Sequence, residues 1–274
     1  MGRVSGNPQR HFEAVKALAD YLAENLDGDS PVTGEALIAA DLDSMSTHLQ
    51  NGTVDMISET PFGALALVES AGAEIVLREW KGGVPSYRSV VFVRAESQLE
   101  SIEDLPGHII AFEDAGSTSA FLVPYAVLRD RGLNLTQLVS PRETPPSDTI
   151  GYAFAEKELN IAHWVVSGVT DAGSFSDSDW EELAETSPEM RENLKIIHTT
   201  EPIIRSLVVV PGDMPEARKR DLKRVLLGMA TSAAGKAVLE RYYKVRKFDE
   251  ITGEAASDLE WIRRLYERAY HEVN

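Results

Sequence analysis

A short run of hydroxyl-bearing residues stands where a strand is expected to give way to a helix. The apolar run at 109–112 is typical of a buried strand, and apolar residues at helical spacing predict a helix over about 118–131. Four residues suited to a turn and to hydrogen bonding lie between these elements: Gly116, Ser117, Thr118 and Ser119. The first turn of a helix presents unpaired backbone N–H groups and the positive end of the helix dipole. Together with the hydroxyls, these groups could form an uncharged cradle for an oxyanion.

The same four residues also fit an ordinary helix N-cap followed by turn residues, and their spacing alone favours neither interpretation. A serine-hydrolase elbow is not indicated, because the pattern glycine–x–serine–x–glycine is absent around Ser117. The histidines show no metal-ligand spacing; they are His11, His48, His108, His163, His198 and His271. The sequence therefore predicts no enzyme activity, no metal site and no cofactor.

The elements that must position the loop alternate between strand and helix patterns. Amphipathic helices are predicted at 12–26 and 43–50, and the last third of the chain, from 215 onward, is predicted to be helical. Strand patterns such as "RSVVFVRA" and "LKIIHTT" lie between them. This alternation favours an α/β architecture with largely parallel sheets.

Length and layout predict two domains. A chain of 274 residues fits two domains of ordinary size. Two extended segments, 93–97 and 199–203, flank a middle block and are expected to be hinge strands. We therefore expect a discontinuous first domain of residues 1–93 and 200–274, and a second domain of residues 94–199.

Composition limits the partners. The net charge of −17 argues against a nucleic-acid partner, because a phosphate backbone requires a basic surface. The absence of cysteine excludes disulfides and thiolate chemistry, and no apolar run is long enough to span a membrane. The opening "MGRVSGNPQRHF" lacks the apolar region of a signal peptide. Because "GRVSG" is typical of the end of a strand and almost nothing precedes it, we expect a mature protein whose signal peptide has been removed.

The stretch from Val90 to Leu133 resembles the phosphate-, phosphite- and phosphonate-binding proteins of bacterial ABC importers. It shares with them a short helix at 101–107, the strand at 109–112, and the "GSTS" loop at 116–119. Further matches are "NGTVDMI" at 51–57, "GVPSYRSVVFVR" at 83–94 and "VSGVTDAGSFS" at 166–176. The resemblance covers roughly residues 2 to 245.

This resemblance implies a two-domain periplasmic binding protein of type II. Each domain would be a mostly parallel sheet flanked by helices, with the ligand in a cleft between the domains. The implied function is capture of a small tetrahedral oxyanion (a phosphonate, phosphite or phosphate-like ion) for delivery to the permease of an ABC importer. The protein would then be a monomer located in the periplasm or outside the cell.

The resemblance also implies the main ligand-binding residues. Ser117, Thr118 and Ser119 match the family's anion loop, and Tyr87 matches a tyrosine that reaches the ligand. Without the resemblance, Tyr87 would be read as a half-buried strand aromatic.

The chain departs from its apparent relatives where some of them recognise an amine. Asp177 is the counterpart of one acid, whereas Ser206 stands in place of a second acid and Asn160 in place of a histidine. Leu42 replaces a tyrosine. These losses predict that 2-aminoethylphosphonate is not preferred over phosphite, phosphate or methylphosphonate.

Four further residues are candidates for ligand contact. Arg205 could pair with an anion through its fork of donors, although a solvated arginine is the alternative. Glu59 and Thr60 precede a helix that begins at Pro61, and Ser5 follows the first strand. For Thr60 a simple N-cap role is the alternative.

Two other functions fit the same fold. A periplasmic sensory module would bind the same ligand and signal to a receptor kinase. An enzyme is a second alternative, since related folds host catalysis, but no nucleophile with a neighbouring base is visible.

Overall fold

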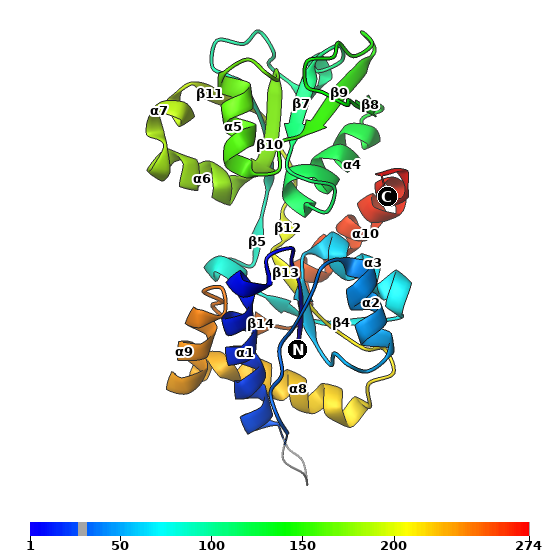
Figure 1. Cartoon of the computed structure of the whole chain (residues 1–274), viewed down its shortest axis with the longest axis vertical. Helices are drawn as coiled ribbons and strands as arrows, with labels where there is room; N and C mark the ends of the chain where they lie inside the picture. Colours follow the sequence, from blue (N-terminus) through cyan, green and yellow to red (C-terminus); the bar gives the residue numbers. More distant parts are fainter. Residues whose placement is uncertain (27–31, 274) are drawn as a thin grey trace. The chain divides into compact units, whose positions relative to one another are not determined.

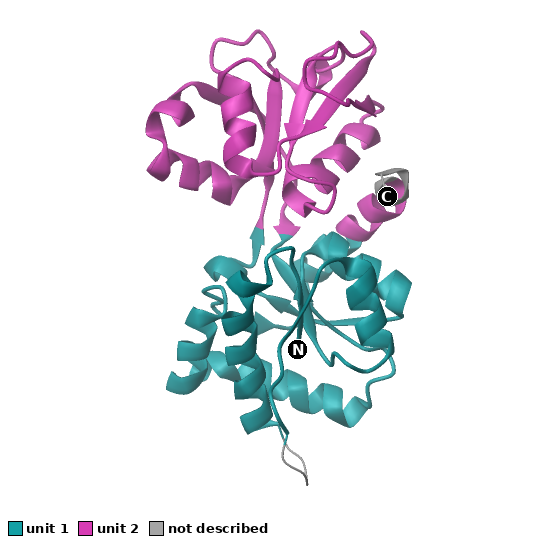
Figure 2. Cartoon of the chain, viewed as in Figure 1, with its two compact units in different colours: residues 1–86, 204–260 teal, residues 87–203, 261–274 magenta. Residues whose placement is uncertain are grey.

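A computed structural model describes residues 1–26 and 32–273 of the chain. These residues form two compact units (Figure 2). Unit 1 contains residues 1–86 and 204–260, and unit 2 contains residues 87–203 and 261–274. Among the residues described, no helix is both long and apolar enough to cross a membrane.

Unit 1 is built on a six-stranded sheet with the order β14-β4-β13-β3-β1-β2 (Figure 1). Its strands are β1 (Gly2–Val4), β2 (Leu37–Ala39), β3 (Ile57–Glu59), β4 (Glu74–Glu79), β13 (Ser206–Val210) and β14 (Phe248–Asp249). β1 pairs in parallel with β2 and β3, whereas β13 is antiparallel to both β3 and β4. β3 and β4 therefore run in the same direction, and the carboxyl ends of β1, β3 and β4 lie at one edge of the sheet.

Helices cover this sheet and bury its apolar side chains. They are α1 (Pro8–Asn25), α2 (Leu42–Gln50), α3 (Pro61–Ala71), α8 (Glu216–Gly228), α9 (Ala233–Arg241) and the first part of α10 (Glu254–Val273). The apolar face of α1, with Val15, Leu18 and Leu22, packs in one core with Val208 of β13. The 3.6-residue period of this face thus predicts its burial correctly.

Unit 2 contains a second six-stranded sheet with the order β11-β6-β10-β7-β9-β8. Its strands are β6 (Ser89–Arg94), β7 (Ile109–Phe112), β8 (Asn134–Gln137), β9 (Thr149–Phe154), β10 (Ala172–Ser176) and β11 (Leu194–Thr199). Its helices include α4 (Val123–Asp130), α5 (Glu158–Val166), α6 (Asp177–Thr186) and α7 (Pro188–Glu192). Phe92, Phe175 and Trp180 stack in its core, with the rings of Phe92 and Phe175 4.4 Å apart.

The predicted α/β class is confirmed, and both sheets are mixed rather than purely parallel. β13 is antiparallel to both of its neighbours, and β14 is antiparallel to β4. In unit 2, β7 is parallel to β9 and β10, whereas β6 is antiparallel to β10 and β11. The reason is the route of the chain: β13 starts at the edge where β4 ends, because the chain returns there from unit 2.

The first crossing between the units lies earlier than the predicted hinge at 93–97. The units divide between Ser86 and Tyr87, within β5 (Ser86–Tyr87), and between Ile203 and Ile204, within β12 (Ile203–Ile204). These two short strands form a separate two-stranded sheet. The second crossing adjoins the predicted hinge at 199–203.

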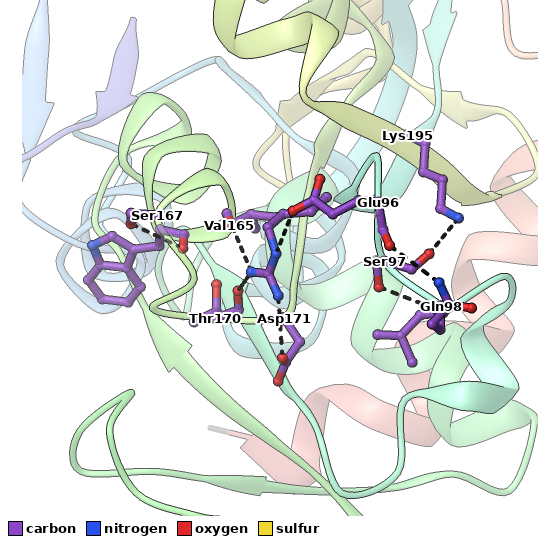
Figure 3. Close-up of polar contacts among 11 residues, drawn as sticks. Glu96, Ser97, Gln98, Val165, Ser167, Thr170, Asp171 and Lys195 are labelled. Atoms are coloured by element: carbon purple, nitrogen blue, oxygen red, sulfur yellow. Dashed lines mark hydrogen bonds and ion pairs between the residues drawn. The ribbon is translucent and has the colours of Figure 1, made fainter.

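The segment 93–97 is a structural part of unit 2. Val93 pairs with Ala172 of β10, and the Arg94 guanidinium donates to the carbonyl oxygens of Val165 and Thr170 at 2.9 and 3.2 Å. Lys195 Nζ donates to the Ser97 carbonyl oxygen at 2.9 Å (Figure 3). A residue held by a central strand and by these hydrogen bonds cannot act as a hinge.

The end of the chain also differs from the predicted division, which assigned 200–274 to one domain. α10 begins in unit 1, but residues from Trp261 onward belong to unit 2. There Trp261 and Leu265 line a cavity with His198, and Arg268 pairs with Asp130. The contacts of the second part of α10 place these residues in unit 2.

Candidate functional site

The "GSTS" loop lies in unit 2 between β7 and a helical segment. Phe112 at the end of β7 and Phe121 after the loop pack against each other with ring centres 5.1 Å apart. The Glu113 N–H donates to the Ala120 carbonyl oxygen at 3.3 Å. The loop is therefore held at both ends by buried aromatic packing and by the backbone.

The helix after the loop begins differently from the regular helix predicted at 118–131. Thr118–Leu122 forms one turn of π-helix, and α4 continues from Val123 to Asp130. Ser117 is the N-cap, and its hydroxyl accepts the Ala120 N–H at 3.2 Å. Turns of π-helix are rare and often occur at functional sites.

Thr118 is the most unusual residue of the loop. It is 2% exposed, and its hydroxyl oxygen is buried with no hydrogen-bond partner among the described residues. A buried polar group without a partner costs free energy, about 1–3 kcal/mol. Such a group requires an explanation, and a bound ligand is one.

Ser119 is connected to the strand that enters unit 2. Its carbonyl oxygen accepts the Ser89 hydroxyl at 2.7 Å. The Ser89 N–H in turn donates to the Thr200 hydroxyl at 3.0 Å. Tyr87, two residues earlier, is 5% exposed and so is more buried than a half-buried strand residue.

Asp177 is the first residue of α6 and is tied to the same entering strand. Its carboxylate accepts the Arg88 N–H at 3.0 Å, and its own N–H donates to the Arg88 carbonyl oxygen at 2.8 Å. The segment 87–89 thus places Asp177 and the Ser119 loop near each other within unit 2. Asp177 is the counterpart of an acid in the apparent relatives, and its carboxylate already accepts a backbone N–H.

Two acids that the sequence analysis missed lie beside the loop. Burial, followed by the charge of Glu158, raises the pKa of Glu113 to about 8. Glu113 therefore holds its proton more tightly than an exposed glutamate does. The position of Glu113, directly after a buried strand and before the loop, was the sequence signal. In the described part of the chain, no group of three or more histidines or acids could hold a metal ion.

Asn160 has a structural partner in unit 2. It lies in the first turn of α5, and its amide nitrogen donates to the Ala155 carbonyl oxygen at 2.8 Å. This bond closes the turn between β9 and α5, where Glu156 adopts a left-handed backbone with φ of 68°.

Glu59 and Thr60 form a compact unit at the start of α3 in unit 1. The Thr60 N–H and hydroxyl both donate to one Glu59 carboxylate oxygen, at 2.8 and 3.2 Å. Thr60 is the N-cap residue, but its own side chain does not cap the helix. The negative Glu59 carboxylate instead lies at the positive end of the helix dipole.

The other candidates in unit 1 are part of local backbone structure. The Arg205 N–H donates to the Pro85 carbonyl oxygen at 3.0 Å, and the Ser206 hydroxyl donates to the Glu59 carbonyl oxygen at 3.3 Å. Ser5 accepts the Asn7 N–H at 3.0 Å in the turn before α1. Leu42 is the first residue of α2 and provides no polar group.

Residues 4–256 match the model of a family described as periplasmic phosphonate-binding substrate-binding proteins of ABC transporters. The phosphate-import protein PhnD of Mycolicibacterium smegmatis is 29% identical over 177 residues. This alignment covers 62% of the chain, which spans about half (53%) of that relative.

Solved structures agree with this match. XAC2383 from Xanthomonas citri, bound to chloride, is 31% identical with a TM-score of 0.92, covering 99% of this chain and 98% of that one. The same protein bound to ATP gives a TM-score of 0.91 at 29% identity, with 99% and 97% covered. PhnD1 from Prochlorococcus marinus, in complex with methylphosphonate, shares the fold, with a TM-score of 0.68 at 17% identity over 97% of this chain and 96% of that one.

Proposed function

The chain belongs to the periplasmic phosphonate-binding proteins of ABC transporters, and from this premise we propose that it captures a small phosphate-type oxyanion for an ABC importer. The ligand class comprises phosphonates, phosphite and phosphate. The family is the substrate-binding component of a transporter, so the expected partners are this ligand and a permease.

One observation carries the proposal. The buried Thr118 hydroxyl has no hydrogen-bond partner among the described residues, and it lies between Ser117 and Ser119 in the segment that resembles the anion loop. An oxyanion would accept hydrogen bonds from this hydroxyl and from nearby N–H groups, so no positively charged side chain would be needed at the loop. In a site shielded from water, several such hydrogen bonds are stronger than they are in solution.

The names of the relatives support the ligand class in outline. They mention phosphate import, methylphosphonate, ATP and chloride for those proteins. All of these are anions, and all except chloride carry a tetrahedral phosphorus group. We take this shared chemistry, rather than any single ligand, as the proposal for this chain.

The proposed roles differ among the candidate residues. Ser117, Thr118 and Ser119 would bind the oxyanion, and Tyr87 would contact it. Asp177, Asn160, Glu59, Thr60 and Ser5 already have hydrogen-bond partners, so their proposed role is to support the site or to rearrange when a ligand binds. Arg205 is proposed to contribute positive charge in unit 1.

The test is calorimetry with the double variant Ser117→Ala, Thr118→Ala. Each lost hydrogen bond to a charged ligand is worth about 1.5–3 kcal/mol, so affinity for phosphate, phosphite or methylphosphonate should fall roughly tenfold or more per hydroxyl. The panel also includes 2-aminoethylphosphonate, which should not bind more tightly than the others.

The matched control is Thr186→Ala with Ser187→Ala, which removes two hydroxyls from the far end of α6 in the same unit. This control should bind like the wild type. Equal affinity of the loop variant and the control would reduce the loop to a helix cap. The importer role is tested separately, by stimulation of the cognate permease's ATPase in liposomes by the liganded protein.

A further inference from the structure

Unit 1 gathers charged side chains at the edge of its sheet where β1, β3 and β4 end. Arg3 lies in β1, Glu59 ends β3, Glu79 ends β4, and Lys81 follows two residues later. Arg205 directly precedes β13, which starts at the same edge. In α/β proteins, ligands bind outside the carboxyl ends of parallel strands.

The two cations Arg3 and Lys81 have two acids nearby, Glu59 and Glu79, whose charges favour the protonated form of both. Within the described ranges, neither forms an ion pair with a carboxylate, and Arg3 Nε is buried without a hydrogen-bond partner. Both lie over the ring of Tyr243, with the Arg3 guanidinium 5.2 Å and the Lys81 ammonium 4.9 Å from its centre. Two like charges that share one ring, and that form no direct ion pair in the described structure, would be stabilised by an added anion.

Burial weakens the charge compensation that Glu79 can give them. It is 0% exposed, and both of its carboxylate oxygens are buried without a hydrogen-bond partner in the described structure. Burial raises the pKa of Glu79, which favours its uncharged form. The Glu59 carboxylate accepts two hydrogen bonds from Thr60 at the start of α3.

The backbone that carries the shared ring is strained. Tyr243 and Lys244 both have left-handed backbone conformations, with φ of 54° and 53°. Consecutive left-handed residues other than glycine are uncommon and tend to occur at functional sites. The Tyr243 hydroxyl is fixed by His11 Nδ1 at 2.9 Å, so the ring is held in place beside the two cations.

We propose that Arg3 and Lys81 form a cationic subsite in unit 1 for a phosphate group of a polyphosphate, so that the protein binds compounds with several phosphate groups in addition to simple oxyanions. The inference concerns unit 1 by itself and rests on the proposed function only for the class of ligand. Two cations suit a group that carries two negative charges.

Lys81 gives the subsite a signature of its own. Burial, then the charge of Arg3, lowers the pKa of Lys81 to about 8, with Glu79, Arg205 and Glu59 as its other charged neighbours. A bound anion favours the charged ammonium and raises this pKa. At pH 8, binding should therefore take up a proton, and affinity should fall as the pH rises through about 8.

The experiment is calorimetry with inorganic triphosphate and with methylphosphonate at constant ionic strength. Lys81→Met and Arg3→Met should each weaken triphosphate binding at least tenfold and change methylphosphonate binding less than twofold. Lys247→Met is the matched control, because Lys247 lies 4.2 Å from the centre of the Trp80 ring but has Asp249 as a partner at 3.4 Å. It should bind both probes like the wild type.

Lys81→Arg keeps the positive charge but removes the group whose pKa lies near 8. This variant should keep triphosphate binding but lose the proton uptake at pH 8, measured as the dependence of the binding enthalpy on the buffer. Triphosphate binding unaffected by both methionine variants, or equal loss of both probes, would overturn this inference. If triphosphate binding depends on Lys81 while methylphosphonate and phosphate do not bind, the proposed function fails and the subsite stands.

Discussion

At the scale of single residues, the hydrogen bonds of the hydroxyl groups characterise the proposed anion loop. The Ser117 hydroxyl accepts the Ala120 N–H, which leaves its own proton to be donated. Thr118 has no partner in the described structure. The hydroxyls of Ser117 and Thr118 would therefore both have a proton to donate to the proposed oxyanion.

The raised pKa of Glu113 predicts a pH-dependent stability. Its pKa is 4.5 in the unfolded chain and about 8 in the folded protein, so the folded state binds this proton more tightly. The free energy of unfolding should therefore fall between pH 4.5 and about 8, by ~2–4 kcal/mol from this group. Glu113→Gln should remove most of this slope.

The measurement is urea unfolding at pH 5 and pH 8. Glu185→Gln, an exposed glutamate in α6, is the matched control and should keep the wild-type slope. An unchanged slope in Glu113→Gln would mean that the pKa of Glu113 is not raised in the folded protein.

At the scale of elements, the site depends on how closely α5 packs against β10. Gly173 of β10 leaves no room for a side chain: an added Cβ would lie 2.5 Å from Ile161 and 2.9 Å from Phe92. β10 also leads directly into Ser176 and Asp177 at the start of α6. A shift of this strand would move both the core and the site.

Gly173→Ala should accordingly destabilise the protein by about 1–3 kcal/mol, the usual effect of overpacking a core. Gly228→Ala is the control, because Gly228 ends α8 and its added Cβ would meet no atom within 4 Å. Alanine has the better helix propensity, so this control should be neutral or slightly stabilising. Urea unfolding monitored by circular dichroism compares the two, and equal stability would show that α5 can move away at little cost.

At the scale of the whole molecule, the net charge opposes the proposed ligand. A chain with a charge of −17 repels an approaching anion, and the local donors must overcome this repulsion. Salt screens the repulsion, since the Debye length falls from about 30 Å at 0.01 M to about 8 Å at 0.15 M. Association should therefore be faster at physiological ionic strength.

Stopped-flow measurement of phosphate binding in potassium gluconate tests this expectation. The association rate constant should rise a few-fold between 0.01 and 0.15 M salt. A rate that falls instead would indicate that local cations, such as Arg3 and Lys81, attract the anion more strongly than the total charge repels it.

The sequence by itself determined the α/β class and the family, and it predicted the place of the proposed anion loop. These follow from local patterns: the apolar periodicity around 109–131, a glycine before the helix (Gly116), and a run of hydroxyl residues. Local patterns depend only on neighbours in the chain, so they can be recognised before folding is known.

Tertiary structure alone decided the rest. The crossing at Ser86 and Tyr87, the antiparallel β13 and the place of Trp261 in unit 2 follow from the route of the chain between the units. Arg3 and Lys81 both lie over the ring of Tyr243, so three segments far apart in the sequence meet at this ring. Burial and charge act through space, so the shifted pKa values of Glu113 and Lys81 arise only when folding brings those segments together.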